Sequence, residues 1–254
     1  MEYIKPEPNT KNYRQMLEKT IEAWQKDPEK RKRKPRLLMH SCCAPCSSAV
    51  LDQLCRFFDI TLFYYNPNIS TEKEFDLRVS ELKRLIHEMG IDVDRTDEDG
   101  MRLSAVSVVV PAYDHREFLS IARGHEKDPE RGERCHLCYR QRLEKTAEYM
   151  DEIRKKASES SDSSVPAYDY FCTTLTISPM KSAEILNVIG AEVGEKHDES
   201  FLPSDFKKKG GYQRSIQLSR EYELYRQDFC GCEFSKAASE RERAERKALN
   251  REHD

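Results

Sequence analysis

The sequence predicts an α/β fold in which helices flank a parallel sheet. Short apolar runs at residues 36–40, 60–65, 91–95 and 170–177 indicate strands, because turn or polar residues bound each of them. Longer segments with helical spacing of apolar residues separate these runs. Such alternation favours parallel strands joined by crossover helices. A length of 254 residues suits one principal domain of this kind.

The first 34 residues are predicted to form a polar arm with one helix. Its sparse apolar positions are Tyr13, Met16, Ile21 and Trp24. A charged run at 26–34 follows the helix, and we expect the arm to pack loosely on the rest. A catalytic α/β domain is expected at 35–235, followed by a charged tail at 236–254.

The first strand runs into the loop Ser41-Cys42-Cys43-Ala44-Pro45-Cys46, and a helix is expected from Ser47 to Phe57. Cys42, Cys43 and Cys46 thus follow the carboxyl end of a parallel strand, where α/β sheets usually bind ligands. The positive end of the helix dipole at this place favours thiolates.

The second strand ends in a turn at Asn66-Pro67-Asn68. An amphipathic helix is expected from Glu72 to Met89, and Gly90 ends it before the third strand. Further crossover helices are expected before Met150 and after Pro179. The segment 155–166 resembles an exposed loop, and residues 233–254 have the composition of a charged, frayed helix.

Composition restricts the class of protein. Hydrophobic residues make up 37% and charged residues 35%, which excludes a membrane protein. The N-terminus lacks a signal-peptide pattern, and no apolar run approaches the roughly 20 residues of a membrane span. We therefore expect a cytoplasmic protein, in which nine cysteines indicate metal ligands or redox chemistry. A net charge of −3 argues against nonspecific coating of DNA but leaves room for local basic patches.

A C-x-x-C pair, Cys135 and Cys138, begins a second helical pattern. Together with Cys42 and Cys43 it offers four thiolates, which suit either an iron–sulfur cluster or a tetrahedral zinc ion. Spacing alone does not choose between them, and a closed structural zinc site remains an alternative.

Cys230 and Cys232 are separated only by Gly231. Such a pair can form a strained, reducible disulfide, with glycine relieving the crowded backbone. Two further metal ligands or two buried thiols are equally compatible with the spacing. Cys55 and Cys172 lie in apolar surroundings and are assigned to the core.

The segment Lys207-Lys208-Lys209-Gly210-Gly211-Tyr212-Gln213-Arg214 combines cations for phosphates with aromatic Tyr212 and the neighbouring Phe206 for base stacking. Tyr64 and Tyr65 are further candidates for stacking. A solvated charged loop is the alternative interpretation.

Five segments together resemble the QueH-type epoxyqueuosine reductase family, over roughly residues 36 to 235. They are HSCCAPCS, FYYNPNIS, ERCHLCYRQRL, TTLTISPMK and DFKKKGGYQRSIQLSREYELYRQDFCGCEFS. The resemblance implies a nucleotide-hydrolase-like (HUP-type) fold and reduction of epoxyqueuosine to queuosine at the wobble position of tRNA. Its partners would be that tRNA and an electron donor, with no membrane.

The resemblance also implies a [4Fe-4S] cluster held by Cys42, Cys43, Cys135 and Cys138, with Cys230 and Cys232 as the redox-active pair. A second, mononuclear metal beside the cluster is a further expectation. Two alternatives from other classes remain: a tRNA sulfur-transfer enzyme of the ATP-pyrophosphatase kind, and a zinc-stabilised RNA-binding module. The former favours a glycine- and serine-rich phosphate loop, which HSCCAPCS replaces here.

Overall fold

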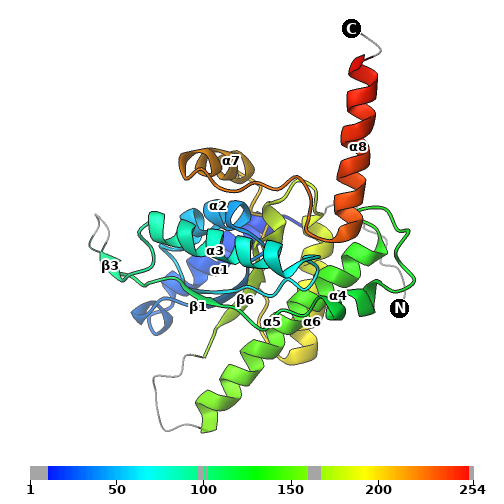
Figure 1. Ribbon diagram of the computed structural model, residues 1–254. Helices are drawn as coiled ribbons and strands as arrows, with labels where there is room; N and C mark the ends of the chain where they lie inside the picture. The colour runs from blue at the N-terminus through cyan, green and yellow to red at the C-terminus, as the bar shows by residue number, and fades with distance from the viewer. Residues whose placement is uncertain (1–10, 97–99, 101, 160–166, 252–254) are drawn as a thin grey trace.

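The computed structural model describes residues 11–96, 100, 102–159 and 167–251. Helices lie on both faces of a central sheet, and the C-terminal helix extends away from this body (Figure 1). Within the described residues, no helix combines the length and the apolar character that crossing a membrane requires.

The central sheet is parallel, with strand order β5-β2-β1-β6 in the described part of the chain. Its strands are β1 (Arg36–His40), β2 (Asp59–Phe63), β5 (Ser107–Val109) and β6 (Tyr170–Thr173). Because β1 pairs with β2 on one side and with β6 on the other, the chain reverses its winding direction at β1. The crevice beyond the carboxyl ends of β1 and β6 is therefore a topological switch point, where such folds usually bind ligands.

Alternate residues of β1 enter two different cores. Leu37 and Met39 pack with one group of buried residues, and Leu38 packs with another. Since all three side chains are fully buried, both faces of the sheet are covered.

The helices divide between these two faces (Figure 1). One face carries α1 (Tyr13–Lys26), α2 (Ala44–Leu54), α3 (Glu72–Glu88) and α7 (Gly211–Glu221). The other carries α5 (Glu133–Glu159) and α6 (Ala183–His197). Helix α4 (His115–Ala122) contacts α5, and α8 (Glu233–Arg251) is the projecting C-terminal helix.

Short elements complete the fold. They are the 3-10 turns Lys30–Lys32 and Thr174–Ile177, and the strands β3 (Arg95–Thr96) and β4 (Arg102–Leu103). The second of these turns continues β6, so the predicted strand 170–177 is a strand for its first half only.

The prediction of an α/β fold with a parallel sheet is confirmed, but its third strand is wrong. Ile91 is buried, yet Val93 is 59% exposed, and the chain then enters a two-stranded antiparallel ribbon rather than the sheet. The sheet strand is instead β5, within the valine-rich stretch 106–110. That run of β-branched residues was the feature of the sequence that could have predicted this strand.

The N-terminal helix is part of the core rather than loosely attached. Leu17 is 1% exposed within the core of the α2 face, and the Tyr13 hydroxyl donates to Glu184 at 2.7 Å. Met16, a predicted anchor, is instead 38% exposed. Residues 155–159 of the predicted loop lie in α5, and 160–166 lie outside the described residues. The division into arm, catalytic domain and tail stays a prediction.

Replacing Gly211 by alanine is expected to lower the free energy of unfolding by about 3 kcal/mol. A Cβ atom there would lie 1.8 Å from the carbonyl oxygen of Phe206, so backbone must move at the start of α7. Gly210→Ala is the matched control, since nothing lies within 4 Å of its added Cβ. Its positive φ of 79° should cost only about 1 kcal/mol. Equal denaturation midpoints for the two variants in urea would contradict the prediction.

Candidate functional site

The turn between β1 and α2 carries the first group of cysteines. Helix α2 has Cys43 as its N-cap and Pro45 in its first turn. Proline is favoured there because it lacks an N–H that the first turn would leave unpaired. The helix consequently begins at Ala44 rather than at the predicted Ser47, which places Cys46 inside its first turn.

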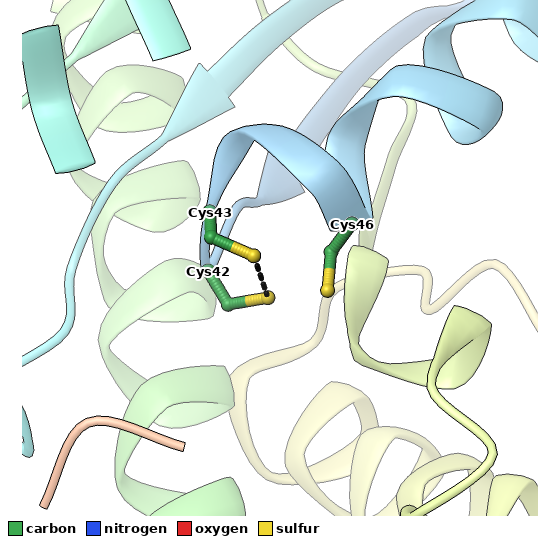
Figure 2. Close-up of side chains that lie close together, drawn as sticks. All are labelled: Cys42, Cys43 and Cys46. Carbon is green, nitrogen blue, oxygen red and sulfur yellow. Dashed lines mark hydrogen bonds between the residues drawn. The ribbon is translucent and has the colours of Figure 1, made fainter. Parts of the chain in front are cut away.

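Cys42, Cys43 and Cys46 form a compact group, called the thiol trio below. Their sulfur atoms all lie within 4.8 Å of one another, and the Sγ atoms of Cys42 and Cys43 are 3.8 Å apart. Figure 2 shows the three side chains gathered at the first turn of α2. Two sulfurs bound to one tetrahedral ion at about 2.3 Å each would lie about 3.8 Å apart. The trio can therefore hold a soft metal.

The predicted ligand set omits Cys46. Its spacing of three residues from Cys43 was the signal that could have included it, because residues three apart share one side of a helical turn. The structure thus groups Cys46 with the two ligands predicted in the first motif.

Hydrogen bonds within the trio shift the pKa values of its thiols in different directions. Contacts with the thiols of Cys43 and Cys46 hold the pKa of Cys42 well below its ordinary value. The contact with Cys42 raises the pKa of Cys43 to about 12. One thiolate is therefore favoured in the metal-free trio, and the other thiols would have to lose their protons to ligate a metal.

A second group comes from α5 and from the segment before α8. Cys135 and Cys138 lie near the start of α5, as predicted, and together with Cys230 and Cys232 they line a small cavity. Cys138 is 6% exposed, and this burial raises its pKa to about 12. The Cys135 sulfur accepts a hydrogen bond from the backbone N–H of Arg131 at 3.3 Å.

The two groups adjoin each other. A cavity of about 280 Å³ is lined by the thiol trio and by Cys230. Cys230 and Arg142 line both this main cavity and the smaller one. The predicted site cysteines thus border two neighbouring cavities. Among the described residues, the trio is the group of three or more possible ligands whose atoms lie close enough to hold one metal ion.

Cys230 and Cys232 are free thiols, and no disulfide joins any cysteines of the described chain. Gly231 has a φ of 133°, a conformation that side chains rarely adopt, so the turn between the two cysteines favours glycine. The Cys232 sulfur accepts from the backbone N–H of Ser235 at 3.4 Å, and the Cys230 carbonyl accepts from Arg78 at 3.1 Å.

The cations that line the main cavity include Arg78, Arg142 and Lys181, none of which the sequence singled out. Burial opposes the charge of Lys181, but the neighbouring Cys230 thiol and Tyr139 hydroxyl hold its pKa above the ordinary value. The signal for Arg142 was its position four residues after Cys138, which puts both on one face of α5.

The basic segment at 207–214 is largely neutralised. Three of its four cations form ion pairs, namely Lys207 with Asp205, Lys209 with Glu18, and Arg214 with Asp52. Lys208 is exposed and lines a surface cavity together with Tyr212. Tyr212 also lines the main cavity, so it connects this surface to the cysteines.

Three aromatic residues predicted to stack on a base cannot do so. Tyr64, Tyr65 and Phe206 are at most 5% exposed, because each packs into the core. Tyr212 is the member of that set with an accessible ring among the described residues. Cys55 and Cys172 are buried among apolar side chains, as predicted.

The sequence model of the family described as epoxyqueuosine reductase QueH matches residues 37–238 of this chain. A protein of that name from Streptococcus pyogenes serotype M1 is 35% identical over 90% of this chain and 80% of its own length. Its counterpart from Staphylococcus epidermidis is 35% identical over 88% of this chain and 84% of its own. The Staphylococcus aureus counterpart is 33% identical, with coverages of 88% and 83%.

Proposed function

This chain belongs to the epoxyqueuosine reductase QueH family, and from that premise we propose that it reduces epoxyqueuosine to queuosine at the wobble position of tRNA. The observation that carries the proposal is the arrangement of the matched cysteines around two adjoining cavities at the switch point of the sheet. Family membership supports this reductase over the sulfur-transfer enzyme and the zinc-stabilised RNA-binding module.

The proposed reaction requires a fixed number of electrons and protons. Both C–O bonds of the epoxide break, a carbon–carbon double bond forms, and the oxygen leaves as water. This consumes two electrons and two protons. Oxidation of two thiols to a disulfide releases the same number of each, so the Cys230 and Cys232 pair matches the requirement. An external electron donor must then reduce the disulfide.

We propose that Cys42, Cys43, Cys135 and Cys138 would hold a [4Fe-4S] cluster. The donor set fits such a group, because these thiols are soft ligands and buried cations border them. When bound, an iron–sulfur cluster supplies electrons one at a time. Cys46, the third thiol of the trio, is then available to a second metal.

Residues around the main cavity can position the modified base. Tyr212 lies at the junction between the main cavity and the surface cavity and offers its ring for stacking. Anticodon loops present unpaired bases that can turn outward into a pocket. We propose that the segment with Lys207, Lys208, Lys209 and Arg214 contacts the tRNA backbone, with Lys208 foremost because its neighbours already form ion pairs.

Anaerobically reconstituted protein is expected to bind iron and sulfide and to convert epoxyqueuosine in tRNA, measured by mass spectrometry of the digested nucleosides. Serine in place of Cys42, Cys43, Cys135 or Cys138 should lower the iron content severalfold, since a hydroxyl is a poor ligand for iron. Cys46→Ser should cost only the iron beyond four atoms per chain, if Cys46 serves a second metal.

Cys55→Ser is the control for these substitutions, because Cys55 is buried in the core away from both cavities. It should retain the iron of the unaltered protein. Full iron content in all four ligand variants would refute the ligand assignment.

Serine at Cys230 or Cys232 is expected to leave the absorbance of the cluster unchanged and to depress turnover at least tenfold. The reason is that either change removes the dithiol that supplies the electron pair. Single-turnover assays without added reductant check this directly. Loss of the cluster would make these residues ligands, and unchanged single-turnover yield would remove their redox role.

Lys208→Ala is expected to weaken tRNA binding and to reduce the slope of log Kd against log salt concentration by about one. Lys209→Ala is the matched comparison and should weaken binding less, because its ammonium group already pairs with Glu18. Filter binding across a salt series measures both. The surface assignment is wrong if the two variants bind tRNA equally well.

A further inference from the structure

Arg142 is the largest fully buried side chain of the described residues, with only 1% of its surface exposed. It lies on α5 one helical turn after Cys138 and borders both cavities. A guanidinium group carries its charge at every accessible pH, so this position places a permanent cation beside the cysteines.

The contacts of Arg142 are all to neutral groups. Its Nε atom donates to the carbonyl oxygen of Cys138 at 3.2 Å, and its Nη1 atom donates to the Asn66 side-chain oxygen at 3.4 Å. Its Nη2 atom is buried and has no hydrogen-bond partner among the described residues. The ring of Tyr139 lies 5.8 Å from the guanidinium carbon. None of these groups is an anion.

A buried charge without a counter-charge is costly, because the low-dielectric interior does not replace its hydration. Burial opposes the charge of Arg142, yet the thiols around it, Cys138 first, hold its pKa above the ordinary value. In the described part of the chain no carboxylate lies within ion-pair distance of Arg142. Its counter-charge must therefore come from the cysteine site.

Arg78 provides an internal comparison. It is also buried at 2% exposure, lines the same main cavity, donates to a cysteine carbonyl and leaves its Nη2 atom without a partner. The difference is that Arg78 forms an ion pair with Glu74 at 2.7 Å. The charge of Arg78 is thus compensated within the protein, and that of Arg142 is not.

We propose that Arg142 is a positioning residue whose fixed positive charge stabilises the thiolate-ligated centre and raises its reduction potential. The inference rests on the proposed iron–sulfur function. Adding an electron makes the centre more negative, and a cation held nearby in a low-dielectric site favours that reduced state. The Nη2 atom is the donor left available for the centre or its sulfur ligands.

The test measures the midpoint potential of the reconstituted centre by a redox titration followed with electron paramagnetic resonance. Arg142→Gln should lower the ratio of reduced to oxidised centre about tenfold at a fixed potential, which corresponds to about 59 mV for a one-electron couple. Arg142→Lys keeps the charge and should remain near the potential of the unaltered protein. The double variant Glu74→Gln/Arg78→Gln removes a neutral pair and should shift the potential less than Arg142→Gln.

An unchanged potential in Arg142→Gln overturns the inference, as do equal shifts in the Gln and Lys variants, which would indicate shape rather than charge. If Arg142→Gln binds no iron, the iron content of Arg142→Lys is the deciding measurement. Normal iron content in Arg142→Lys supports a requirement for positive charge at this position. Loss of iron in both variants refutes that requirement. Failure of the proposed function is distinguishable, because the unaltered protein would then show no reducible iron–sulfur signal before any variant is compared.

Discussion

Parallel pairing of β1 with both β2 and β6 places the ends of these strands at one edge of the sheet. The buried His40 ring reinforces this edge through Thr173 at 2.9 Å and the Tyr65 carbonyl at 3.2 Å. Burial lowers the pKa of His40 to about 3, so the ring stays neutral. Its two hydrogen bonds hold the ends of the strands together. The turn with Cys42 and Cys43 begins directly after His40. The orientation of this turn therefore depends on the end of β1.

Two helix starts then bring sulfur to the edge from opposite faces of the sheet. The N-terminus of α2 presents the thiol trio from one face, and the N-terminus of α5 presents Cys135 and Cys138 from the other. Because β6 lies beside β1, Thr174 reaches the Cys42 sulfur at 3.6 Å. The segment before α8 closes the arrangement with Cys230 and Cys232. The site therefore forms only when these separate segments of the chain are folded together.

Cations around the main cavity are the electrostatic counterpart of this concentration of thiols. Arg78, Arg142 and Lys181 come from three separate segments, and all border the main cavity. Their positive charges favour thiolates, and thiolates in turn offset the cost of burying the cations. Metal binding and the folding of this region should consequently support each other.

Sequence alone determined what depends on local pattern: the strand at 36–40, the helix from Glu72, the α/β class and the cysteine motifs. These follow from periodicity, capping and residue chemistry, which neighbours along the chain encode. Tertiary structure decided what depends on distant partners. The sheet strand is the valine-rich β5 and not residues 91–95, because β5 is the segment that pairs with β2. Glu18 and Asp52 form ion pairs with Lys209 and Arg214, which the sequence alone presented as unpaired cations. The uncompensated charge of Arg142 likewise appears only once its surroundings are assembled, because burial and counter-charge are properties of packed neighbours.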